Sequence, residues 1–143
     1  MDAPHDFPQM FVAACERLNA VDSNGNMFSS EGLSLPKEPI IVTQDYNEEH
    51  VLGTGTLRLE GDTITVVLCL QPVPPDILQR YACPAFIAEK IEDRGEVRII
   101  HAAKLLSVGL CLTHATPGIA PIRIAKPDEI PSGCSIDESS LDR

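Results

Sequence analysis

The sequence predicts a mainly β fold: a small α+β, barrel-like domain of six to eight mostly antiparallel strands with one or two short helices. The clearest observation is the segment 51–70, where apolar and polar positions alternate along a strand that follows a turn at Glu60-Gly61-Asp62. A second apolar segment, residues 105–113, has the length of a buried strand. Proline and glycine break the rest into short pieces, and many short strands favour a closed or nearly closed barrel because closure removes free edges.

The first third of the chain predicts an arm, a strand and several turns. Residues 1–9 hold two prolines and charges of both signs, which is typical of an extended arm. Residues 10–18 lead into a dense turn signal, which favours a strand, although Phe7, Phe11, Cys15 and Leu18 also have helical spacing. Three elements follow in order: a serine-capped helical turn at 29–33, a short buried strand at 39–42 and a polar loop at 44–50.

The second half predicts one helix, four strands and a tail. Pro75-Asp76 can begin a helix that runs to about Ala82, since proline fits the first turn and aspartate favours its positive end. Gly109 interrupts an apolar run, which indicates a bulge or a close backbone approach. The remaining elements are strands at 85–91, 96–102 and 105–113, an edge strand at 119–124 and an acidic, flexible tail at 126–143. A single domain at 10–125 lies between arm and tail.

Composition excludes several function classes. The net charge of −10 over 143 residues opposes binding to nucleic acid, whose partners normally present a basic patch. No apolar run approaches the roughly 20 residues of a membrane-spanning helix, and the N-terminus has no apolar signal segment. We therefore expect synthesis in the cytoplasm and neither nucleic acid nor a membrane as partner.

Cysteine and histidine positions predict no cofactor and no metal site. The number of cysteines is odd and no Cys-x-x-Cys pair occurs, which favours buried free thiols over a disulfide framework. No two histidines have the spacing of metal ligands, and Asp45, Glu48, Glu49 and His50 form only a loose cluster. The five cysteines are Cys15, Cys69, Cys83, Cys111 and Cys134.

Four stretches carry a family resemblance. Residues 19–33 open with an N-x-x-D-x-x-G turn, Val51-Leu52-Gly53 precedes the hairpin, Cys83-Pro84-Ala85-Phe86 follows the expected helix, and residues 98–118 hold an R-x-I strand, an apolar strand and a Pro-Gly turn. In this order and at this spacing the stretches resemble the prohead proteases of tailed phages, which share the fold of the herpesvirus assemblin. The resemblance implies a protease-like barrel over residues 10–124.

The sequence departs from that family at its reactive positions. The family's histidine lies about seven residues before the glycine that matches Gly53, where this chain has Asp45-Tyr46. Cys83 stands at the place of the catalytic serine, and Ala85 replaces a motif glycine. We therefore expect no catalytic residues. An active enzyme would need Cys83 as nucleophile, His50 as base, and His101 or His114 to orient that base.

The resemblance with these departures predicts a non-catalytic phage head protein, a capsid decoration, cement or assembly component located in the virion head. Its expected partners are the major capsid protein or other head proteins, and homo-oligomerisation is left open. One alternative is an active maturation protease that cleaves scaffold and capsid-protein arms. A second is an acidic inhibitor directed at a host protein, which the net charge allows.

Overall fold

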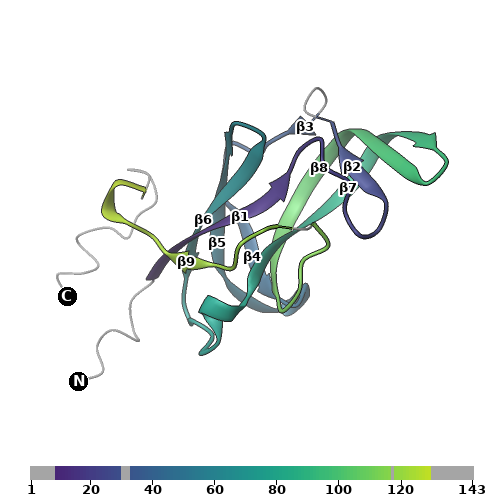
Figure 1. Cartoon of the computed structure of the whole chain (residues 1–143). Helices are drawn as coiled ribbons and strands as arrows, with labels where there is room; N and C mark the ends of the chain where they lie inside the picture. The colour runs from purple at the N-terminus through teal and green to yellow at the C-terminus, as the bar shows by residue number, and fades with distance from the viewer. Residues whose placement is uncertain (1–8, 30–32, 117, 130–143) are drawn as a thin grey trace, which may run out of the picture.

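The computed structural model describes residues 9–29, 33–116 and 118–129, and these fold into a single nine-stranded sheet with two 3-10 turns (Figure 1). The predicted mainly β class is confirmed. The strands are β1 (Gln9–Arg17), β2 (Asn26–Phe28), β3 (Leu33–Ser34), β4 (Ile40–Gln44), β5 (Asn47–Glu60), β6 (Thr63–Leu70), β7 (Tyr81–Arg94), β8 (Val97–Cys111) and β9 (Arg123–Ile124). The 3-10 turns are η2 (Ile77–Gln79) and η3 (Pro127–Glu129).

The sheet is mixed, with an antiparallel half and a half built around β8. β1, β6, β5 and β4 pair antiparallel in that order. β2, β3 and β4 each pair parallel with successive parts of β8, so they lie one after another along one of its edges. β7 pairs antiparallel along almost the whole of β8 and therefore occupies its other edge. The predicted hairpin at 51–70 is confirmed as β5 and β6, paired from Gly53 and Leu70 to Glu60 and Thr63.

The core lies on the concave side of this curved sheet. Ile64, Val66, Leu68 and Leu70 of β6 are almost completely buried, as their period of two predicts. They pack in one cluster with β4 and β8 residues such as Val42 and Leu110. Val67 is also buried, because Met10 and Val12 of β1 join it in a small cluster on the opposite face. β6 is thus covered on both faces and contributes to both hydrophobic clusters.

The barrel is not closed by a strand ladder. The far edge of β1 pairs with the short β9, through Phe11 and Ile124, and not with β7. Residues 112–116 and 118–125, which we call the closing segment, bridge the remaining gap. The Ile122 amide donates to the Arg80 carbonyl, at 2.9 Å, just before β7, and the Ala125 amide donates to the Met10 carbonyl, at 3.2 Å, on β1. Between β1 and β7 there is therefore no ladder of paired strands, and an irregular segment with isolated hydrogen bonds lies in its place.

Arg80, just before β7, contacts four parts of the chain. Its side chain is only 7% exposed. The guanidinium donates to the Asp76 carboxylate at 2.8 Å, to Asp45 in the β4–β5 turn at 3.1 Å, and to the Leu110 carbonyl of β8 at 2.7 Å. Because the Arg80 carbonyl also accepts from Ile122, one residue fixes η2, the turn, the end of β8 and the closing segment.

Arg80 also explains why the helix predicted over 75–82 is wrong. Asp76 binds the Arg80 guanidinium, and its side chain makes no capping hydrogen bond to the turn that follows. Arg80 itself has extended backbone angles, φ −102° and ψ 163°, so the helix ends after the single turn of η2. The local helix signal therefore gives way to a tertiary contact that draws the arginine inward.

Other expected boundaries also shift. The polar loop expected at 44–50 is a two-residue turn, since β5 already begins at Asn47. The strands expected at 85–91, 96–102 and 105–113 are the two long strands β7 and β8, which continue through bulges. Residues 127–129 form η3, held by an ion pair of Arg123 with Glu129, and the helical turn expected at 29–33 lies largely outside the described residues.

Replacing Arg80 with methionine should destabilise the fold by about 2–3 kcal/mol, since the Leu110 carbonyl loses a charged, buried donor. Urea denaturation gives the free energy of unfolding. Arg94→Met is the matched control, because Arg94 is exposed and its pair with Glu92 lies in solvent, and it should change that free energy by about 0.5 kcal/mol or less. Equal effects of the two substitutions would contradict the role given to Arg80.

Candidate functional site

Two residues with a left-handed backbone, Asp45 and Tyr46, form the turn between β4 and β5. Their φ angles are 53° and 64°, and Gln44 pairs with Asn47 across the turn. Two-residue hairpin loops of this kind favour asparagine and glycine, because a larger side chain makes positive φ costly. Contacts outside the turn hold it: Asp45 binds Arg80, and the Tyr46 ring packs on β8.

The Tyr46 ring lies against Gly109. A Cβ at Gly109 would lie 2.6 Å from the ring carbon Cδ1, so only glycine leaves room for the ring. The Tyr46 hydroxyl donates to the Pro84 carbonyl of β7 at 3.4 Å. The sequence predicts either a bulge or a close backbone approach at Gly109. The structure shows a close approach, and the group that approaches is the Tyr46 side chain.

Tyr46 and Cys83 meet in a cavity of about 220 Å³ at the ends of β7 and β8. Tyr46 and Cys83 thus lie together, although they are 37 positions apart in the sequence. The resemblance would place a histidine at Asp45-Tyr46 and a serine at Cys83. Tyr46 is 46% exposed, and the partial desolvation of its side chain against β8 raises its pKa further above the ordinary value, so its hydroxyl keeps its proton. The cavity is lined by Glu16, Asp22, Asn24, Asn26, Tyr46, Cys83, Pro84, Phe86, Cys111, Thr113, His114 and Ala115.

Cys83 is held as a protonated thiol. It is 5% exposed, and its Sγ donates to the Thr113 carbonyl at 3.3 Å. Its interaction with Cys111 and its burial both raise its pKa far above the ordinary value for a thiol. The thiolate is the nucleophilic form of cysteine, so these contacts oppose a role for Cys83 as the nucleophile that attacks a peptide bond.

His114 lines the same cavity, but both of its ring nitrogens are engaged. Nδ1 accepts the Thr116 amide hydrogen at 2.9 Å, so the proton of the neutral ring lies on Nε2, which donates to the Cys15 carbonyl of β1 at 2.7 Å. Glu16 lies nearby and accepts the Thr116 hydroxyl hydrogen. These contacts fasten the closing segment to β1, and they leave His114 no free lone pair with which to accept a proton from Cys83.

The other two candidate histidines lie away from Cys83. His50 is exposed on the outer part of β5 and does not line the cavity. His101 is on β8, where its Nε2 lies 2.7 Å from a carboxylate oxygen of Glu92 on β7. Of the residues named for an active enzyme, the structure therefore brings together Cys83 and His114 only.

Sequence reasoning missed Cys111 and Glu16 as members of the cavity. Cys111 is the last residue of β8 and Glu16 is near the end of β1, 95 positions apart. No local pattern joins them, because their proximity depends on the closing segment and on the register of β7 with β8. The only available signal was a single acidic residue inside an otherwise apolar predicted strand.

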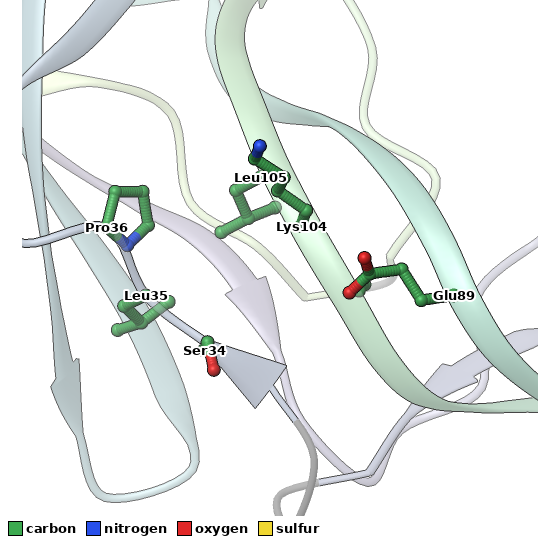
Figure 2. A pocket seen from close by; sticks show the side chains of 7 residues that line it. Ser34, Leu35, Pro36, Glu89, Lys104 and Leu105 are labelled. Atoms are coloured by element: carbon green, nitrogen blue, oxygen red, sulfur yellow. The ribbon is translucent and has the colours of Figure 1, made fainter.

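A second cavity, of about 310 Å³, lies where β3 and the residues after it approach β8 (Figure 2). Figure 2 shows Leu35 and Pro36 on one side and Leu105 on the other, with Glu89 of β7 beyond β8. The lining is mostly aliphatic and includes one acid and one base, Glu89 and Lys104. It offers space for an apolar group and no arrangement of nucleophile and base.

No protein-family model, no curated protein and no solved structure matches the chain. Within the described ranges, no helix is long and apolar enough to cross a membrane. Among those same residues, no group of three or more His, Cys, Asp and Glu side chains is arranged to hold a metal ion.

Gly109→Ala should destabilise the protein by about 1–3 kcal/mol, because the added methyl group overlaps the Tyr46 ring. In a Tyr46→Ala background the same substitution should cost much less, since the obstacle is gone and contacting residues are not additive. Urea denaturation of the four proteins gives the coupling between the two positions. Additive losses would show that the ring does not require the glycine.

Glu16 should make stability depend on pH. Burial raises the pKa of Glu16 above its ordinary value of 4.5, so the folded chain holds this proton more tightly than the unfolded chain. The stabilisation is complete below that ordinary value and is lost as pH rises through the higher folded pKa. Glu16→Gln should therefore gain stability relative to wild type as pH rises from 4.5 through the higher folded pKa. Unfolding free energies that stay parallel over this range would contradict the assignment.

Proposed function

We propose that the chain is a non-catalytic structural protein of a phage head, which keeps a prohead-protease-like layout and binds capsid or other head proteins. The observation that carries this proposal is the contact of Tyr46 with the Cys83 region. Where the family resemblance calls for a base beside a nucleophile, this chain has a protonated phenol over a protonated thiol. Neither group can accept a proton in an acyl-transfer step.

The contacts of the other cavity residues support the same proposal. His114 and Glu16 hold the closing segment to β1, and Arg80 holds the β4–β5 turn, so the polar groups here serve the fold. A fold that no longer performs chemistry can still present surfaces to other proteins. The net charge of −10 suits contact with a basic partner surface.

A cleavage experiment and a particle analysis test the proposal together. The purified chain and its Cys83→Ala variant are incubated with the scaffold and capsid proteins encoded with it, and intact masses are followed. We expect no cleavage by either protein. We also expect the intact chain in purified mature heads, in a fixed ratio to the capsid protein.

Cleavage by the wild type that Cys83→Ala abolishes would overturn the proposal in favour of a maturation protease. Absence of the chain from mature heads, with no cleavage, would also overturn it, and would favour the reading as an acidic inhibitor of a host protein. Tyr46→His is an informative additional variant, because it restores the expected base position while leaving Cys83 in place.

A further inference from the structure

Cys83 and Cys111 lie on paired strands and open into the same cavity. Tyr81 pairs with Cys111, and Cys83 pairs with Gly109, so the two cysteines are diagonal neighbours on one face of the β7–β8 ladder. Their side chains interact directly. Gly109 contributes no side chain beside them, and the Tyr46 ring fills that space.

The two thiols have different surroundings. Cys83 is buried, whereas Cys111 is partly exposed at the end of β8. The hydrogen bond from Cys83 lowers the pKa of Cys111, and this effect outweighs the opposing effects of partial burial and of the Asp45 charge. The single hydrogen of Cys83, which otherwise points to the Thr113 carbonyl, can turn to the Cys111 sulfur when that sulfur ionises.

A partly exposed cysteine beside a second, buried thiol is an arrangement found in cysteines that respond to oxidants. We propose that Cys83 and Cys111 form an oxidation site, in which Cys111 reacts with a hydroperoxide and Cys83 then closes a disulfide. This inference does not rest on the proposed function, since it concerns the chemistry of the cavity alone.

The steps balance with hydrogen peroxide as the oxidant. The Cys111 thiolate attacks one peroxide oxygen and the O–O bond breaks, which leaves a sulfenic acid on Cys111 and releases hydroxide. The Cys83 sulfur then attacks the Cys111 sulfur, its proton goes to the departing oxygen, and water leaves as the S–S bond forms. Two thiols are oxidised, and one peroxide is reduced to two molecules of water once the hydroxide takes up a proton.

The geometry allows this closure with a small movement. Diagonal neighbours in a regular ladder lie about 7–8 Å apart, just beyond the Cα separation that a disulfide spans, so closure requires the two strands to move closer here. Cys111 pairs with Tyr81 at the last position of β8, so this strand end would shift toward Cys83 while Arg80 keeps its bond to the Leu110 carbonyl. The disulfide would remove the thiol hydrogen that Cys83 gives to Thr113 and would tie β7 to β8 at the mouth of the cavity.

The test uses the full chain with Cys134→Ser, since Cys134 lies outside the described residues and could otherwise form mixed disulfides. The protein is treated with hydrogen peroxide and analysed by intact mass and peptide mapping. We expect a loss of two hydrogen atoms, a Cys83–Cys111 linkage, and reversal by dithiothreitol. In Cys83→Ser, dimedone should trap a sulfenic acid on Cys111, whereas Cys111→Ser should leave Cys83 unmodified.

Cys69→Ser is the matched control, because Cys69 is also partly exposed, on β6, and this variant should still form the linkage. Cys111 should be oxidised several-fold faster than Cys69, because the neighbouring Cys83 thiol lowers the pKa of Cys111. Equal rates at the two cysteines, trapping on Cys83 in Cys111→Ser, or a protein that stays reduced would each overturn the proposal. All the variants can be made without touching Glu16, His114 or Arg80, which hold the fold.

Discussion

A buried guanidinium holds together the parts of the chain that form the cavity. Arg80 donates to a carboxylate in the β4–β5 turn, to a carboxylate at η2 and to a carbonyl at the end of β8. Burying a charge is costly unless partners satisfy it, so the positions of these partners are constrained together. The turn that carries Tyr46, the strand end that carries Cys111 and the path of the chain into β7 are all fixed by this requirement.

The same constraint accounts for an otherwise unfavourable backbone. Asp45 and Tyr46 both have positive φ, a conformation that persists in non-glycine residues only when the surroundings determine it. Asp45 is held by the arginine, and Tyr46 by the absence of a side chain at Gly109. The strained turn therefore directs an aromatic ring over Cys83. The resemblance would place a catalytic base at this turn, whereas in this chain the Tyr46 ring packs against β8.

The sequence predicts those features that depend on neighbouring residues. The β5–β6 hairpin follows from a period of two, and Gly109 signals a close approach within an apolar strand. The helix expected at 75–82 fails because its local signal competes with a contact made 35 and 30 positions away. The meeting of Tyr46, Cys83 and Cys111 depends on strand register, which no short pattern encodes. The path of the closing segment could not be predicted either, since its hydrogen bonds to β1 join residues about 100 positions apart.

The arrangement of β2, β3 and β4 along β8 has a consequence during synthesis. These three short strands leave the ribosome about 65–75 residues before the strand that pairs with them. Until β8 emerges, their hydrogen-bonding groups stay open on that side, while β1, β5 and β6 can already pair. The nascent chain thus passes through a period with an incomplete sheet, in which long-range pairing is slow and exposed edges invite association with other chains. A short interval before β8 emerges would therefore limit association between nascent chains.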